Sequence, residues 1–94
     1  FEGNYAPSSA GGIHMGIGTP QFPSRLLIID SVFRGNGVLD PTGPGRTLGQ
    51  FGAIKADGQL RVRGSLFEGN ESKYAAAIQS GAPLWIENST FVGN

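Results

Sequence analysis

The side chains best suited to chemistry are an aromatic and charged set, formed by Arg61, Arg63, Trp85 and Glu87. Arg61 precedes Trp85 by 24 positions, and Arg63 precedes Glu87 by the same 24 positions. An exposed indole can stack on a sugar ring, while Arg61 and Glu87 could bond its hydroxyls. The set therefore predicts a platform for a surface glycan. The alternative is a surface ion pair between Arg63 and Glu87, with Arg61 resting on the indole and no ligand present.

The other reactive side chains form no recognisable catalytic or metal-binding pattern. His14 is the only histidine, and we expect it to face solvent without a second ligand of its type. Asp30, Asp40 and Asp57 fall in turns, without the spacing of a calcium loop or of paired glycosidase carboxylates. The chain has no cysteine. We therefore expect no enzyme activity, no catalytic residue, no metal and no cofactor.

Length and charge narrow the classes of partner. The 94 residues suit a single domain, and seven basic residues balance seven acidic ones. Nucleic-acid partners usually require a basic excess, so none is expected. Apolar runs such as residues 26–29 are far shorter than the roughly 18 residues of a membrane span, so we expect no membrane insertion of this segment.

A four-residue word, Phe-x-Gly-Asn, recurs along the whole chain. It begins at Phe1, Phe33, Phe67 and Phe91 and ends at Asn4, Asn36, Asn70 and Asn94. The intervals are 32, 34 and 24 residues, and the last is the bare repeat. Such a period is typical of a solenoid, in which each turn packs on its neighbours. We predict one β-solenoid segment over residues 1–94, with coils at about 5–36, 37–70 and 71–94.

The residues between these words indicate three short strands in each coil. Residues 60–63 alternate apolar and charged side chains, as a strand with one buried face does. Glycines at the corners would turn the strands into a triangular coil. The sequence predicts an all-β parallel β-helix with strands near 11–15, 52–56 and 76–80, then 26–29, 60–63 and 84–87, then 32–34, 66–68 and 90–92.

Stacked coils bring equivalent side chains into columns about 4.8 Å apart. The four phenylalanines form one inward column and the four asparagines another, whose amides can bond one another. Outside, Glu2, Arg34 and Glu68 alternate in charge, which avoids repulsion between like charges. The remaining inward columns are Ile13, Ile54 and Ile78; Leu26, Leu60 and Leu84; and Ile28, Val62 and Ile86.

Two paired words carry a resemblance to a known group. GGI at 11–13, GAI at 52–54 and AAI at 76–78 stand in the place of a G-G-A-I word, and each is followed by F-x-G-N. The pairing resembles the right-handed parallel β-helix repeats of polymorphic outer-membrane and related surface proteins. That resemblance implies a right-handed coil, an extracellular or cell-surface location in a bacterium, and a role in adhesins or autotransporter passengers. The first GGI departs from the pattern by an insertion, and AAI lacks both glycines.

Two insertions interrupt the repeat, at about 16–24 and 38–50. Long loops on a rigid scaffold often carry binding residues. Leu27 and Ile29 point outward on the first coil, and adjacent exposed aliphatic side chains need cover. Phe22 in the first insertion could provide that cover, and so could a neighbouring molecule.

These observations predict a non-catalytic structural or adhesive β-solenoid. Neither end of the repeat carries a polar cap, and solenoids need caps for solubility. We therefore expect the ends to stack on further coils, either in a head-to-tail filament or within a longer surface passenger. The alternative is a fragment that binds or cleaves polysaccharide. A groove lined by Trp85, Arg61, Arg63 and Glu87 would favour that alternative, whereas their burial against a second chain would favour the structural role.

Overall fold

The computed structural model describes residues 1–4, 11–36, 52–72 and 74–94. This part of the chain is all-β and has nine strands. The second insertion, at 38–50, lies outside the described residues. The strands are β1 (Ile13–Met15), β2 (Arg25–Ile29), β3 (Val32–Arg34), β4 (Ile54–Ala56), β5 (Gln59–Arg63), β6 (Leu66–Glu68), β7 (Ile78–Ser80), β8 (Leu84–Glu87) and β9 (Thr90–Val92).

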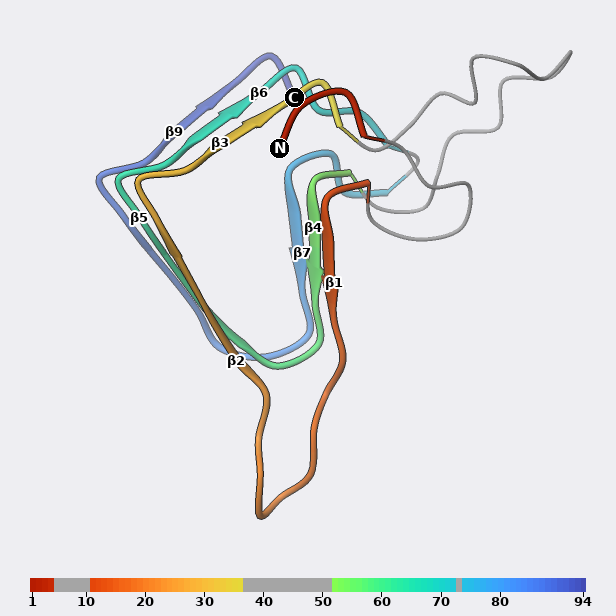
Figure 1. Cartoon of the computed structure of the whole chain (residues 1–94), viewed down its shortest axis with the longest axis vertical. Coiled ribbons are helices and arrows are strands. Elements are labelled where there is room, and N and C mark those ends of the chain that lie inside the picture. The colour runs from red at the N-terminus through yellow and green to blue at the C-terminus, as the bar shows by residue number, and fades with distance from the viewer. Residues whose placement is uncertain (5–10, 37–51, 73) are drawn as a thin grey trace, which may run out of the picture.

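The strands form three parallel sheets, ordered β1-β4-β7, β2-β5-β8 and β3-β6-β9. Viewed along the coil axis, the sheets are the three sides of a triangle, and each coil contributes one strand to each side (Figure 1). The predicted parallel β-helix of about three coils is therefore confirmed. The register also matches, since Phe33 pairs with Phe67 and Phe67 with Phe91.

Strand boundaries differ slightly from the sequence expectation. The strands of the first sheet begin at Ile13, Ile54 and Ile78, two residues later than predicted. The small residues before each isoleucine turn the corner instead of extending the strand. In the second sheet, β2 and β5 begin one residue earlier than predicted, at Arg25 and Gln59.

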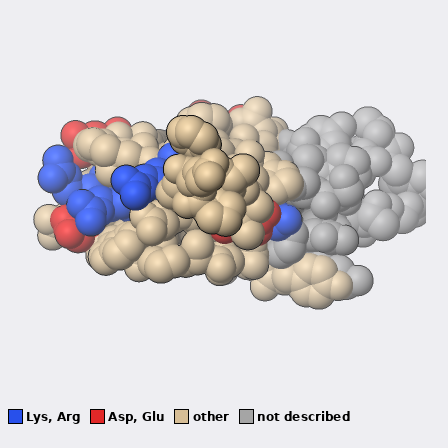
Figure 2. Space-filling model, turned by 90° about the horizontal axis from the view of Figure 1, so that it is seen from below, with Lys and Arg blue, Asp and Glu red and all other residues tan. Residues whose placement is uncertain are grey.

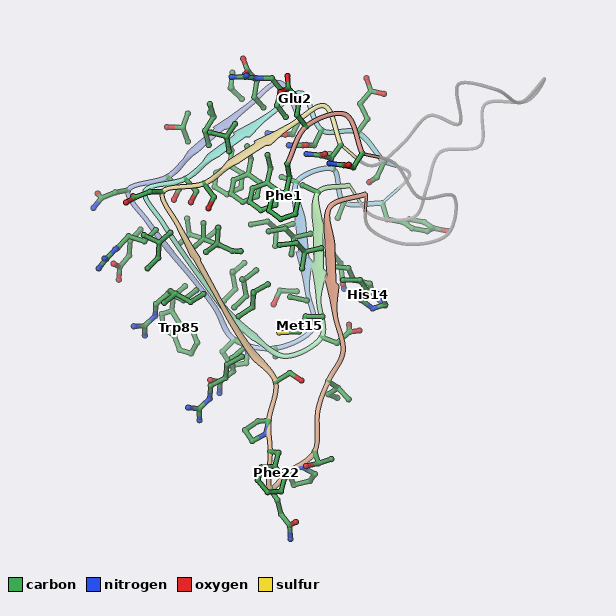
Figure 3. The ribbon with its side chains drawn as sticks, viewed as in Figure 1. Phe1, Glu2, His14, Met15, Phe22 and Trp85 are labelled. Atoms are coloured by element: carbon green, nitrogen blue, oxygen red, sulfur yellow. The ribbon has the colours of Figure 1, made fainter. Side chains whose placement is uncertain are left out.

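The core is centred on the middle coil and extends into the first coil at Ile28 and Phe33. Ile54, Leu60, Val62 and Phe67 have no exposed surface, because a coil covers them on both sides. Phe33 of the first coil is equally buried, because Phe1 and Phe67 stack on its two sides. The inward residues of the last coil are less buried, since they have a neighbouring coil on one side only. Figure 3 shows Phe1 and Met15 directed into the triangle and His14 and Trp85 directed away from it.

The phenylalanine column is a continuous stack of rings. Successive ring centroids lie 4.7, 4.9 and 4.7 Å apart, and the ring planes diverge by only 5°, 2° and 2°. These separations follow the strand spacing of a sheet, so each ring packs on the next without a void. The column links all three coils through one corner of the core.

The asparagine column is a ladder of side-chain and backbone hydrogen bonds. The Oδ1 atom of Asn70 accepts from the backbone N–H of Asn36 at 2.9 Å and from its Nδ2 at 3.1 Å. Nδ2 of Asn70 in turn donates to Phe33 O at 3.0 Å and to Asn94 Oδ1 at 2.8 Å. Asn36 and Asn70 are buried, and these bonds satisfy polar groups that water cannot reach.

The corner before the first sheet explains why the GGI and GAI words use small residues. Backbone N–H groups of one coil donate there to carbonyls of the next, as Ala53 N does to Ala76 O at 3.0 Å. A Cβ atom placed on Gly52 would overlap the Ala76 carbonyl, and one on Gly12 would lie 2.6 Å from Ala53 O. The coils can approach closely here because Gly12 and Gly52 have no side chain.

Replacing Gly52 by alanine is expected to lower the free energy of unfolding by about 1–3 kcal/mol, because the added methyl group forces two coils apart. Thermal and urea denaturation followed by circular dichroism would measure the loss. Gly16→Ala is the matched control, since a Cβ there meets no atom within 4 Å. Equal stability of the two variants would show that the close approach does not restrict this corner.

Candidate functional site

The outer face of the β2-β5-β8 sheet holds the residues that the sequence singled out. Alternation along the strands turns every second side chain outward. Register pairing places Leu27 beside Arg61 and Arg61 beside Trp85. The next outward column contains Ile29, Arg63 and Glu87. The predicted neighbours are therefore neighbours in the structure.

A groove of about 370 Å³ lies on this face. Small-ligand sites typically occupy roughly 300–1,000 Å³, so its size suits a small ligand or a short stretch of a larger one. Its lining residues are Arg25, Leu26, Leu27, Gln59, Leu60, Arg61 and Trp85. Leu26 and Leu60 belong to an inward column, and the other five residues occupy outward positions of the strands.

Arg61 and Trp85 form the contact expected from their spacing. The guanidinium carbon of Arg61 lies 5.4 Å from the centroid of the indole ring, within range of a cation–π interaction. Trp85 is nevertheless 43% exposed, so part of the ring remains open to solvent. The pair is held in place and still accessible.

Arg63 and Glu87 behave differently from the expectation. They are register partners, but no ion pair within 4.0 Å joins them among the ion pairs of the described residues. Neither residue lines the groove. Outward positions two residues apart on a strand are separated by roughly 6.6 Å, so this column lies beyond the rim formed by Arg61 and Trp85.

Arg25 and Gln59 are groove residues that the sequence reasoning missed. They are register partners one outward position before Leu27 and Arg61. Alternation along a strand could have identified them, because each lies two residues before an outward residue, Leu27 or Arg61. They were missed because the predicted strands began one residue too late.

The first insertion forms a projecting tab and does not cover the outward aliphatic residues. An antiparallel bridge joins Gly18 to Pro23, and Thr19 N donates to Phe22 O at 3.1 Å. Phe22 lies at the tip of the tab, away from the sheet (Figure 3), and is 78% exposed. Leu27 is 58% exposed. Cover by the chain's own first insertion, one of the two alternatives, is therefore not found.

A polar cluster on the β1-β4-β7 face was not predicted. Nε2 of His14 lies 3.6 Å from Oδ2 of Asp57, and Nζ of Lys55 lies 3.3 Å from the same oxygen. The sequence predicts a solvent-facing His14 and an Asp57 in a turn, and does not bring them together. The register of the repeat places Lys55 beside His14 and could have revealed that pair, but not the approach of Asp57.

The outward column of alternating charge is present as expected. A backbone β-bridge pairs Glu2 with Arg34, and Arg34 Nε donates to Glu68 Oε2 at 2.6 Å. The hydrogen bond and charge of Glu68 raise the pKa of the Arg34 guanidinium, which is already charged at any physiological pH. Both side chains are about half exposed, so we assign this pair a structural role and no chemistry.

The two faces of the solenoid perpendicular to its axis expose interior columns. Ile86 and Phe91 point inward on the last coil, yet they are 45% and 41% exposed. Phe1 and Leu84 are also open to solvent at these faces. Strands β7, β8 and β9 lie at one edge of their sheets in the described part of the chain. We call the surface formed by Leu84, Ile86 and Phe91 the end face.

Neither the rest of the described residues nor the comparisons with known proteins point to a further chemical site. Across the residues that the structure describes, no group of three or more His, Cys, Asp or Glu side chains could hold a metal ion. The same residues contain no helix long and apolar enough to cross a membrane. Comparison with protein-family models, curated proteins and solved structures found no match. Function is therefore inferred from the geometry of the groove and the end face.

Proposed function

We propose that this chain is a non-catalytic structural or adhesive β-solenoid whose end face stacks on a further coil. The observation that carries the proposal is the exposure of the inward columns at Leu84, Ile86 and Phe91. In the middle coil, the equivalent residues Leu60, Val62 and Phe67 are fully buried between two coils. One more coil would give the end face the same environment.

The energetics favour such stacking. Apolar surface removed from water contributes roughly 25 cal/mol per Å², and the three end-face side chains are all apolar. A strand at a sheet edge also presents backbone groups that can pair with another strand. The repeat supplies a matched surface, because its columns of Leu, branched aliphatic and Phe residues recur in every coil.

The location proposed for this solenoid is the cell surface of a bacterium. The support is the resemblance of its G-G-A-I and F-x-G-N words to surface β-helix repeats. In that setting the further coil belongs either to a longer passenger or to a second copy. Both would contact the end face through the same residues.

The proposal predicts that the 94-residue chain associates through its end face. We expect multi-angle light scattering to show oligomers that grow with concentration, and negative-stain electron microscopy to show narrow unbranched rods. Ile86→Lys should prevent association, because a coil stacked on it would bury an unpaired ammonium group. The lysine can reach solvent in the isolated chain, so the fold should survive.

Ile17→Lys is the matched control for that experiment. Ile17 is an exposed isoleucine on the tab, away from the end face, and the same substitution adds the same charge. We expect it to associate like the original chain. A chain that stays monomeric at every concentration, or two variants that associate equally, would contradict stacking through the end face.

A further inference from the structure

The groove on the β2-β5-β8 sheet is cationic in a chain whose formal net charge is zero. Arg25 and Arg61 line it, and Arg63 lies one outward position beyond. No carboxylate lies within 4.0 Å of these three guanidinium groups in the ion pairs of the described residues. Seen from below, most of the visible basic side chains lie on the side of the molecule where β2 and β5 lie, with acidic side chains beside them (Figure 2).

The remaining groove residues supply an aromatic face and a neutral polar group. Trp85 presents part of its ring to solvent, and its contact with Arg61 restrains both side chains before any ligand arrives. Gln59 adds an amide that both donates and accepts hydrogen bonds. Leu27 adds an exposed apolar surface. Restraint of this kind lowers the entropy lost on binding.

We propose that this groove binds an acidic oligosaccharide, a glycan whose sugar rings carry carboxylates. A guanidinium group binds a carboxylate through two parallel hydrogen bonds, which Arg25 and Arg61 can offer. The apolar face of a sugar ring packs on the open part of the indole, and Gln59 bonds ring hydroxyls. This inference goes beyond the stacking proposal and does not depend on it.

The geometry of the sheet favours a glycan over an acidic peptide. An extended peptide gains most of its affinity by adding a strand to a sheet edge, where backbone groups are unpaired. The groove lies on the face of the sheet. The backbone groups of β5 are already paired with those of its two neighbours, β2 and β8. A ligand there meets side chains only, which suits hydroxyl and carboxylate groups.

The lining also favours binding without cleavage. Hydrolysis of a glycosidic bond generally uses two carboxyl groups on either side of the bond. The seven lining residues include no Asp and no Glu. Glu87 lies in the neighbouring column with Arg63 and does not line the groove.

The test uses the 94-residue chain and an alginate hexasaccharide as the acidic probe. Trp85 is the only tryptophan, so intrinsic fluorescence reports directly from the groove. We expect a saturable change in emission with the acidic hexasaccharide. The carboxyl-reduced hexasaccharide, which keeps the rings and loses the charges, should bind at least about tenfold more weakly.

Variants on one strand separate groove binding from general charge attraction. Arg61→Ala and Arg63→Ala remove the same charge from β5, but only Arg61 lines the groove. By isothermal titration calorimetry, Arg61→Ala should weaken binding about ten- to hundredfold, and Arg63→Ala by less than about threefold. Trp85→Ala should also weaken it strongly. Circular dichroism would confirm that each variant keeps the fold.

Three outcomes would overturn the assignment. The first is the absence of binding to the acidic hexasaccharide at millimolar concentration. The second is equal weakening by Arg61→Ala and Arg63→Ala. The third is binding of poly-glutamate that is as tight and as dependent on Trp85, which would assign the groove to an acidic peptide. Stacking is measured separately, because Ile86 points to the opposite side of β8 from Trp85.

Discussion

Replacing Phe67 by alanine is expected to lower the free energy of unfolding by about 3–5 kcal/mol. Its ring is fully buried and lies between the rings of Phe33 and Phe91, at centroid distances of 4.9 and 4.7 Å. Truncation removes both stacking contacts and leaves a cavity at the centre of the core. Since domains of this size are stable by only about 5–15 kcal/mol, this variant should be close to unfolding.

Urea denaturation followed by far-ultraviolet circular dichroism would measure this loss. Phe22→Ala is the matched control, because that ring is exposed at the tip of the tab. We expect a change of less than about 0.5 kcal/mol for the control. Comparable losses in the two variants would mean that the phenylalanine column does not hold the coils together.

The second large effect is expected for Asn70→Ala. The substitution removes the acceptor of the Asn36 backbone N–H and the donor to Phe33 O, and both of those groups are buried. Each buried polar group left without a partner costs about 1–3 kcal/mol, so the variant should lose roughly 3–5 kcal/mol. The loss comes from orphaned backbone groups more than from the small side chain itself.

Asn94→Ala is the appropriate comparison for Asn70. Asn94 accepts the same pair of bonds, from Asn70 N at 3.0 Å and Asn70 Nδ2 at 2.8 Å, and its own Nδ2 donates to Phe67 O at 2.8 Å, but it lies exposed on the last coil. Water can replace both its oxygen and its nitrogen there, so a loss of less than about 1 kcal/mol is expected. Hydrogen exchange of the Asn36 amide should rise in Asn70→Ala alone. Equal losses of unfolding free energy in Asn70→Ala and Asn94→Ala would show that burial does not determine the cost.

The repeat made the fold predictable from one sequence. Each Phe-x-Gly-Asn word fixes one corner of a coil, so aligning the words sets the register of all three sheets. The positions of Arg61 beside Trp85 and of Phe33 beside Phe67 follow from that alignment alone. Short strands are usually ambiguous in sequence, but four copies of one pattern remove the ambiguity.

Features that depend on neighbouring coils were harder to predict. Alternation identified Ile86 as inward-facing, but only the structure shows how far it stays open to solvent. The groove required Arg25 and Gln59, whose outward positions were lost when the strands were predicted to begin one residue late. The meeting of His14, Lys55 and Asp57 depends on side-chain reach, which the alignment of motifs does not describe.

The asparagine ladder gives the solenoid a chemical polarity. Asn4 donates to Asn36, Asn36 to Asn70 and Asn70 to Asn94, so each accepting amide oxygen faces the preceding coil and each of these side-chain donors reaches the following one. The Nδ2 groups of Asn36, Asn70 and Asn94 also donate back to a phenylalanine carbonyl of the preceding coil. If the end faces of two copies met each other, the side-chain N–H groups of their two Asn94 residues would face each other without an acceptor. The ladder continues only when coils are added in one sense. Any structure built by such addition would therefore have two chemically distinct tips, and elongation could proceed at different rates from each.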